Sequence, residues 1–165
     1  HRKDIILPAR RGRCKTKGLL LVDTSGSMLD HECDKAVQHL GKILALFPQS
    51  SVTMVHVDTK VRTSKEYRAC DFPIREFEGW KGRGGTDLRP GFNWAKQRRA
   101  QFDWMLVVTD FEFNWWEQQD PHIPTLWINV HSSGMPYGWE AHGGRTPFGK
   151  LVNYHHCAMN AARYA

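Results

Sequence analysis

Long apolar stretches are missing from this sequence. No run of consecutive apolar residues exceeds five, the length of Ile43 to Phe47, whereas a membrane-spanning helix needs about 20. Paired cysteines are missing as well. No C-x-x-C spacing and no Asn-x-Ser/Thr glycosylation acceptor occurs, and the four cysteines are Cys14, Cys33, Cys70 and Cys157. The short apolar runs predict a protein without a membrane span. The cysteine pattern favours reduced thiols, so we expect a cytoplasmic protein.

An excess of positive charge is missing from most of the chain, although the formal net charge is +6. Residues 1–17 contain seven of the 23 lysines and arginines and one of the 17 acidic residues, which leaves 16 of each kind in residues 18–165. We therefore predict a basic N-terminal arm or linker over residues 1–17 and a folded domain over residues 18–165. A basic arm can bind phosphate, so a nucleic-acid-binding domain is one alternative. Because the chain begins at His1 rather than Met, we also expect a fragment of a longer protein.

The spacing of the apolar residues predicts an α/β domain. Of the 165 residues, 41% are hydrophobic and 24% are charged, which is typical of one globular domain. Short apolar runs predict buried strands at residues 19–23, 52–57, 105–108 and 125–130, with weaker strands at 72–77 and 148–154. Helical spacing predicts helices over residues 33–47 and 88–102. This alternation indicates a Rossmann-like, doubly wound, mostly parallel central sheet with helices on both faces.

Three polar clusters stand where functional groups gather in such a sheet. The clusters are Asp23-Thr24-Ser25-Gly26-Ser27 after the first strand, Gly84-Gly85-Thr86-Asp87 before the second helix, and Thr109-Asp110 after the third buried strand. The carboxyl ends of parallel strands meet at one edge of the sheet. The clusters offer carboxylate and hydroxyl oxygens, which suit Mg²⁺ or Mn²⁺, because these hard cations prefer oxygen and need few direct carboxylates.

The order of these clusters resembles the von Willebrand factor A domain. That family carries a metal-ion-dependent adhesion site with the pattern D-x-S-x-S, then a distant Thr, then a distant Asp. The matching residues here are Asp23, Ser25, Ser27, Thr86 and Asp110. The resemblance spans residues 18–155. It looks closest to a bacterial subfamily without an assigned function, in which the domain follows a metallopeptidase-like region.

The resemblance implies a metal-dependent protein-binding module rather than an enzyme. The neutral hydroxyl ligands would leave residual positive charge on the Mg²⁺ or Mn²⁺, so that an Asp or Glu carboxylate of a partner protein can take an open coordination position. The family further suggests a bacterial or phage adaptor for a MoxR-type AAA+ ATPase. We expect Glu112, Trp115 and Trp116 to contact the partner, with at least one tryptophan on an exposed aromatic rim.

One position departs from the family pattern. Most members have glycine after the last Asp, whereas this chain has Phe111 followed by Glu112. We therefore expect a differently shaped loop at this point. In such a loop, Glu112 could compete with the partner's carboxylate for the metal.

A phosphohydrolase of the haloacid-dehalogenase type is the other alternative. Those enzymes place a nucleophilic Asp after a buried strand in a D-x-T/S-G-T/S turn, which the segment from Asp23 to Ser27 resembles. They also need paired acids at a later strand end, where this chain has Thr109-Asp110-Phe111-Glu112. The glycine-rich cluster before the second helix would have no role in such an enzyme.

Overall fold

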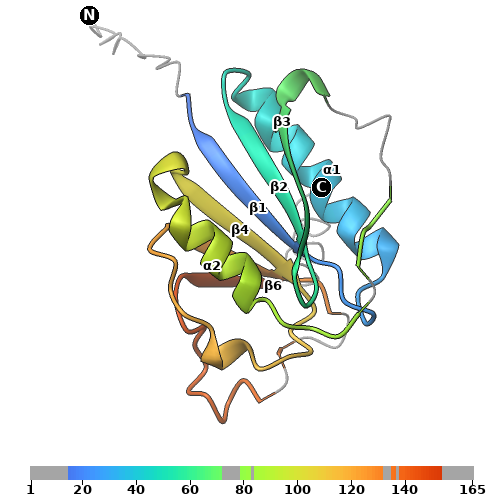
Figure 1. Cartoon of the computed structure of the whole chain (residues 1–165), viewed down its shortest axis with the longest axis vertical. Coiled ribbons are helices and arrows are strands. Elements are labelled where there is room, and N and C mark those ends of the chain that lie inside the picture. Colours follow the sequence, from blue (N-terminus) through green and yellow to red (C-terminus); the bar gives the residue numbers. More distant parts are fainter. Residues whose placement is uncertain (1–14, 72–78, 83, 132–134, 137, 154–165) are drawn as a thin grey trace, which may run out of the picture.

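One six-stranded sheet forms the centre of the molecule. The computed structural model describes residues 15–71, 79–82, 84–131, 135–136 and 138–153. The strands lie in the order β3-β2-β1-β4-β5-β6 (Figure 1). Their bounds are β1 Lys17–Asp23, β2 Ser51–Val57, β3 Val61–Arg68, β4 Trp104–Thr109, β5 Thr125–Asn129 and β6 Lys150–Asn153. The described helices are α1 (Asp30–Leu46), α2 (Arg89–Gln97) and the short 3-10 helices η1 (Ala69–Asp71), η2 (Arg99–Gln101) and η3 (Trp115–Glu117).

The central strand β1 is apolar at consecutive positions because it is buried on both faces. Its residues Leu19 to Val22 are at most 1% exposed, and β1 pairs in parallel with β2 on one side and β4 on the other. The predicted buried strands are therefore confirmed as β1, β2, β4 and β5. The strand β1 begins at Lys17, so its first residue falls within the segment predicted as an arm.

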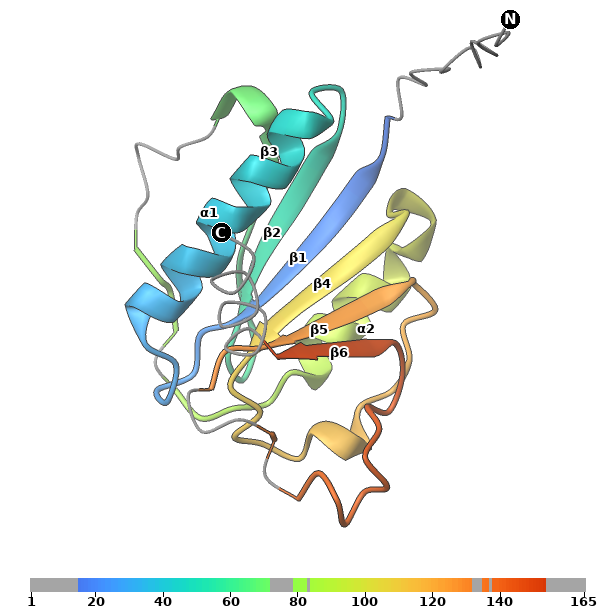
Figure 2. The same ribbon diagram turned by 180° about the vertical axis from the view of Figure 1, so that it is seen from behind.

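The two α-helices cover opposite faces of the sheet, as Figures 1 and 2 show from the two sides. Alternate residues of β1 divide between two cores. Leu19 and Leu21 share one core with α2, and Leu20 and Val22 share the other with α1. The helical faces that meet these cores are Phe92 and Ala95 of α2, and Cys33, Val37, Leu40 and Leu44 of α1. The predicted doubly wound arrangement is thus confirmed.

The edge strand β3 was missed by the sequence analysis. It pairs antiparallel with β2 through a hairpin, and the edge strand predicted at 72–77 lies outside the described residues. Most of β3 is exposed or half-buried, and only Tyr67 is buried. Because an edge strand with one open face needs few apolar residues, its polar sequence gave no signal.

The remaining elements differ from the prediction mainly in their ends. The helix α2 ends at Gln97 and is followed by η2, because Arg98 leaves the helical conformation at φ −114°. The last strand β6 lies inside the predicted range of 148–154. Among the described residues, no helix has the length and apolar character required to cross a bilayer.

Close packing of α2 on the sheet depends on Gly91, and we expect Gly91→Ala to destabilise the fold by about 1–3 kcal/mol. A Cβ atom at Gly91 would lie 2.8 Å from both Leu21 Cδ1 and Val57 Cγ2. In an open helix interior the same change stabilises by about 1 kcal/mol. The exposed Asn93 of α2 is the control, since Asn93→Ala should stabilise slightly. Urea unfolding measures the free energy of unfolding of both variants. A Gly91→Ala variant more stable than wild type would contradict the close contact between α2 and the sheet at this position.

Candidate metal centre

The carboxyl ends of β1 and β4 bring two of the predicted clusters together. The strands are parallel neighbours, with Val22 opposite Val108, so Asp23 and Thr109 end side by side. The hydroxyl of Thr109 donates a 2.7 Å hydrogen bond to Asp23 Oδ2. The same hydroxyl accepts the Phe111 N–H at 3.1 Å. Thr109 therefore links the first strand end to the loop that follows Asp110.

Exposure increases along the first cluster. Asp23 is fully buried, Ser25 is 1% exposed, and Ser27 lies at the surface. The Ser25 N–H donates to Asp23 Oδ1 at 2.9 Å, and the Ser25 and Ser27 hydroxyl oxygens lie 3.3 Å apart. The two serine hydroxyls are thus next to each other, with the carboxylate deeper in the molecule. This arrangement suits a cation that contacts hydroxyls directly and a buried carboxylate through water.

The glycine-rich segment is fastened beside this loop by backbone hydrogen bonds. The Gly26 N–H donates to the Gly84 carbonyl oxygen at 3.0 Å, and the Asp87 N–H donates to the Asp58 carbonyl oxygen at 2.7 Å. Thr86 is half-buried and lies between these two attachments. The structure therefore brings the segment that carries Thr86 to the same sheet edge as Asp23.

The two acidic groups of the site are buried, and their electrostatic surroundings are unfavourable without a cation. The pKa of Asp23 is raised to about 6, mainly by burial and to a smaller extent by nearby Asp110, against hydrogen bonds from Ser25 and Thr109 that lower it. Asp110 is 5% exposed, and its Oδ1 accepts the Glu112 N–H at 3.0 Å. Its Oδ2 is buried and has no hydrogen-bond partner among the described residues.

A divalent cation fits this arrangement. It would offset the repulsion between two buried carboxylates and satisfy the open oxygen of Asp110. Within the described ranges, no group of three or more His, Cys, Asp or Glu side chains gathers in a metal-binding arrangement. A cation at this edge would therefore depend on the hydroxyls of Ser25, Ser27 and Thr86 beside the two carboxylates, which is the chemistry of Mg²⁺ or Mn²⁺ rather than Zn²⁺.

Comparison with known families agrees with the sheet topology. A family model described as VWA-like domain (DUF2201) matches residues 19–155. The chain belongs to this family. A curated relative, an uncharacterized protein of Thermotoga maritima, is 29% identical over 104 residues. The match covers 63% of this chain and 25% of that protein, so this chain spans only a quarter of the relative's length.

Two solved structures share the VWA-like fold. One is the conserved hypothetical protein BatB from Bacteroides thetaiotaomicron, with a TM-score of 0.57 and 12% identity, covering 90% of this chain and 96% of that chain. The other is an aerotolerance-related membrane protein from Bacteroides fragilis, with a TM-score of 0.52, 12% identity and coverage of 90% and 97%. At this identity the likeness concerns the fold alone.

Phe111 of this VWA-like domain has the backbone conformation that glycine adopts most easily. Its φ is +61°, in the left-handed region that bulky residues rarely adopt. The side chain is 1% exposed and contacts the rings of Trp115 and Trp127 at centroid distances of 5.8 and 5.4 Å. The ring of Phe111 therefore packs in the core while its backbone has a conformation typical of glycine.

The predicted aromatic rim is wrong for Trp115. Its side chain is fully buried among Phe111, Trp116 and Trp139, because this loop has no α-helix and the aromatic side chains cover the sheet themselves. Trp116 is half-buried and stacks on His142 at a centroid distance of 4.0 Å. Glu112 is exposed, and its Oε1 lies 3.5 Å from His131 Nε2. Only Glu112 and Trp116 of the three predicted residues keep surface that a partner could reach.

Two residues beside the proposed site have no role predicted from the sequence. The Thr109 hydroxyl donates a hydrogen bond to the Asp23 carboxylate and so orients it. The position of Thr109 directly before Asp110 at a strand end is the feature of the sequence that could have indicated this role. Asp58 stands at the corresponding end of β2, directly after Val57. Because a single Asp after a strand is common, its sequence gives no comparable signal.

Proposed function

We propose that this VWA-like domain is a metal-dependent protein-binding module. In this proposal Asp23, Ser25, Ser27, Thr86 and Asp110 hold one Mg²⁺ or Mn²⁺, some of them through water, as a metal-ion-dependent adhesion site. When bound, the cation supplies residual positive charge and an open coordination position for an Asp or Glu carboxylate of the partner. VWA-like domains commonly mediate protein interactions, which supports this function.

One observation carries the proposal: the Oδ2 atom of Asp110 is buried without a hydrogen-bond partner among the described residues, next to the loop of Asp23. Buried polar atoms almost always have a partner, so an exception needs an explanation, such as a missing ion. The interactions that set the pKa of Asp23 include no positively charged group. A bound cation would account for both features.

The contacts of Asp23 give little support to the phosphohydrolase alternative. A nucleophilic carboxylate needs an oxygen directed at the substrate. Both Asp23 oxygens accept hydrogen bonds, from the Ser25 N–H and from the Thr109 hydroxyl, and the side chain is fully buried. We therefore propose that this domain binds rather than catalyses.

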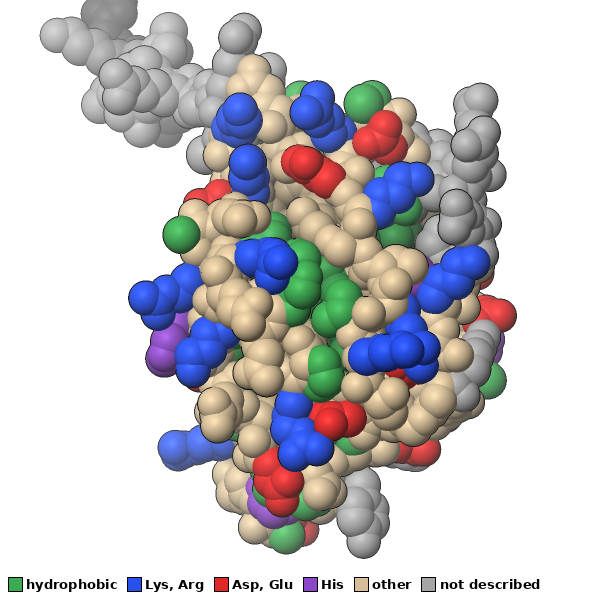
Figure 3. Space-filling view, in the orientation of Figure 1, with side chains coloured by type: hydrophobic (Ala, Val, Ile, Leu, Met, Phe, Trp, Pro, Cys, Tyr) green, Lys and Arg blue, Asp and Glu red, His purple; other side chains and the backbone are tan. Residues whose placement is uncertain are grey.

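The nucleic-acid alternative has no support on the face shown in Figure 3. Lysine and arginine side chains are spread over that face with acidic side chains between them, instead of forming one continuous basic patch. Two of these arginines pair with aspartates, Arg62 with Asp58 at 2.6 Å and Arg89 with Asp87 at 2.8 Å. Most of the basic arm, residues 1–14, lies outside the described residues, so its role stays a prediction.

We further propose that this module acts as an adaptor. The family resemblance suggests a MoxR-type AAA+ ATPase as the partner that supplies the carboxylate. The chain spans a quarter of its curated relative, so other parts of a longer protein would connect this module to a target. A purified ATPase of that kind should bind the Mn²⁺-loaded chain and be released by EDTA.

Calorimetric titration with Mn²⁺ tests the metal centre. We expect one site in the wild-type chain, no measurable binding in Asp110→Ala, and affinity reduced at least about tenfold in Thr86→Ala, because each loses an oxygen ligand. The exposed His31 lies outside the proposed ligand set, and His31→Ala is the control that should bind normally. Equal affinity in all four proteins would contradict the site.

The open coordination position has its own measurement. Water bound to Mn²⁺ enhances proton relaxation, and acetate serves as the probe for a partner's carboxylate. Acetate should lower the relaxation enhancement of the Mn²⁺-loaded protein by displacing bound water. If acetate has no effect although Mn²⁺ binds, the cation is structural and the protein-binding role fails.

A further inference from the structure

An ion pair between the buried Asp58 and the partly exposed Arg62 lies beside the proposed metal centre and is not part of its ligand set. Asp58 directly follows β2 and is fully buried. The guanidinium of Arg62 donates to it twice, from Nε to Oδ1 at 2.8 Å and from Nη2 to Oδ2 at 2.6 Å. Oδ1 also accepts the N–H groups of Thr59 and Lys60. Burial alone would raise the pKa of Asp58, but these hydrogen bonds outweigh it and bring the pKa to about 2.

Asp58 contacts the segment that carries Thr86 at both ends of that segment, with its backbone carbonyl at one end and with its side chain at the other. At one end, the Asp87 N–H donates to the Asp58 carbonyl oxygen at 2.7 Å. At the other end, Gly84 packs against the Asp58 side chain, where an added Cβ would lie 3.1 Å from Oδ2. The Gly84 carbonyl oxygen in turn accepts the Gly26 N–H of the serine loop at 3.0 Å. Asp58 therefore contacts residues 84–87 through one backbone hydrogen bond and one side-chain packing contact.

We infer that Asp58 and Arg62 are positioning residues of the metal centre, which hold residues 84–87 so that Thr86 stays beside the serine loop. The inference rests on the proposed function. Mg²⁺ and Mn²⁺ sites require ligands in nearly fixed positions, and groups that orient ligands typically change metal affinity 10- to 100-fold. Without Arg62 the Asp58 carboxylate would be a buried, uncompensated charge. We expect the Asp58 carboxylate then to turn toward water, so that Gly84 would lose its packing contact with the Asp58 side chain.

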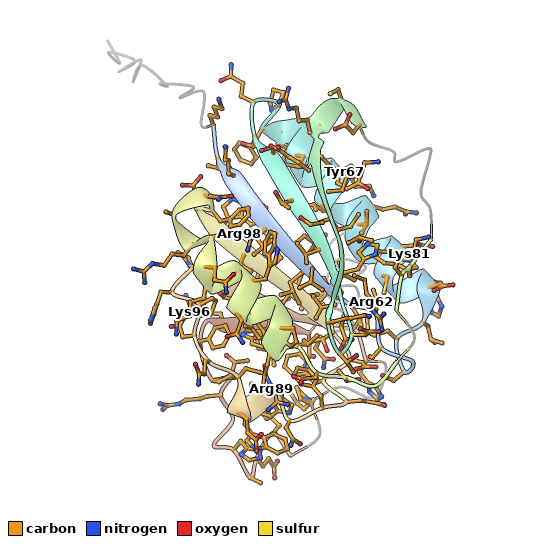
Figure 4. The ribbon with its side chains drawn as sticks, in the orientation of Figure 1. Arg62, Tyr67, Lys81, Arg89, Lys96 and Arg98 are labelled. Carbon is orange, nitrogen blue, oxygen red and sulfur yellow. The ribbon has the colours of Figure 1, made fainter. Side chains whose placement is uncertain are left out.

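A second arginine pair on the same side of the molecule provides a matched control. Arg89 donates to the Asp87 carboxylate with Nε and Nη2 at 2.8 Å each. Arg62 and Arg89 both lie toward the end of the sheet that carries the site, one on the β2–β3 hairpin and one at the start of α2 (Figure 4). The side chain of Arg89 is 66% exposed, against 29% for Arg62. Its pair is thus solvated and supports no buried carboxylate.

The test measures Mn²⁺ affinity in the full chain by calorimetry, together with thermal unfolding in EDTA. Arg62→Met should weaken Mn²⁺ binding about tenfold or more, Arg62→Lys should recover part of it, and Arg89→Met should stay within about twofold of wild type. If Arg62→Met lowers the unfolding temperature but binds Mn²⁺ like wild type, the pair only stabilises the hairpin, and the inference is overturned. If wild type binds no Mn²⁺, the proposed function fails, and this inference with it.

Neighbouring glycines give a test that leaves both charges in place. Neither Gly84 nor Gly85 has a left-handed φ, so alanine fits the backbone at both positions. An added Cβ at Gly84 would press on Asp58, whereas at Gly85 it would make an ordinary contact of 3.7 Å with Thr59 Cγ2. We expect Gly84→Ala to weaken Mn²⁺ binding several-fold more than Gly85→Ala. Equal affinities of the two variants would count against Asp58 as the support.

Discussion

Replacement of Asp23 by asparagine is expected to abolish stabilisation by Mn²⁺ while making the metal-free protein more stable. A pKa of about 6, in place of 3.8, means that ionising this buried carboxylate at neutral pH costs on the order of 3 kcal/mol. Asparagine removes that charge. Its amide can still accept the Ser25 N–H and donate to the Thr109 hydroxyl, the two groups that now contact Asp23.

Thermal and urea unfolding with EDTA or with Mn²⁺ measure both effects. At a Mn²⁺ concentration 100 times Kd, wild type should gain about 2.7 kcal/mol and Asp23→Asn nothing. The control is Asp103→Asn, which removes an exposed carboxylate that accepts the Lys17 N–H at the other end of β1. That variant should keep the full Mn²⁺ stabilisation. If Asp23→Asn were also stabilised by Mn²⁺, Asp23 would not belong to the site.

The same variant should change the pH dependence of the metal-free protein. A raised pKa means that the Asp23 contribution to stability is complete below about pH 4 and is lost as the pH rises through 6. Burial, with Lys81 nearby, lowers the pKa of His56 to about 4, so its contribution is lost as the pH falls below 6.5. The two effects oppose each other in wild type. Between pH 7 and pH 5, Asp23→Asn should therefore lose about 1 kcal/mol more than wild type.

Phe111 should show the largest effect on stability, with an unusual order of variants. Loss of its buried ring is expected to cost about 3–5 kcal/mol in Phe111→Ala. Alanine would still carry the penalty of the φ of +61°. Glycine relieves that penalty, so Phe111→Gly should be about 1 kcal/mol more stable than Phe111→Ala, although it has the smaller side chain.

Phe92 is the control for this order. It is 2% exposed and lies within α2, where the backbone is helical. There glycine costs more than alanine, so Phe92→Gly should be about 1 kcal/mol less stable than Phe92→Ala. Urea unfolding of the four variants gives the comparison. If Phe111→Gly were also less stable than Phe111→Ala, the left-handed φ at position 111 would not carry the expected penalty.

Only the part of the site that lies at the ends of strands could be predicted from the apolar pattern of the sequence. The pattern from Asp23 to Ser27 and the pair Thr109-Asp110 each follow an apolar run, and parallel strands bring such ends together. The segment of Thr86 follows no described strand, so the sequence placed it only between a glycine-rich loop and the second helix. The backbone contacts of Gly84 and Asp87 that bring it to the site join residues distant in sequence.

By itself, the sequence determined the elements whose apolar pattern matches their burial. The runs 19–23 and 105–108 specify buried parallel strands, and the spacing of residues 33–47 specifies a helix with one apolar face. Only the tertiary structure decided the positions of the polar and aromatic groups that do not follow a buried strand or a helical spacing. It placed the polar β3 at an edge, buried Trp115 in a loop without an α-helix, and joined Asp58 to Arg62. Burial of such groups depends on which neighbours cover them, and for Trp115 these neighbours include Trp139 from a later part of the chain.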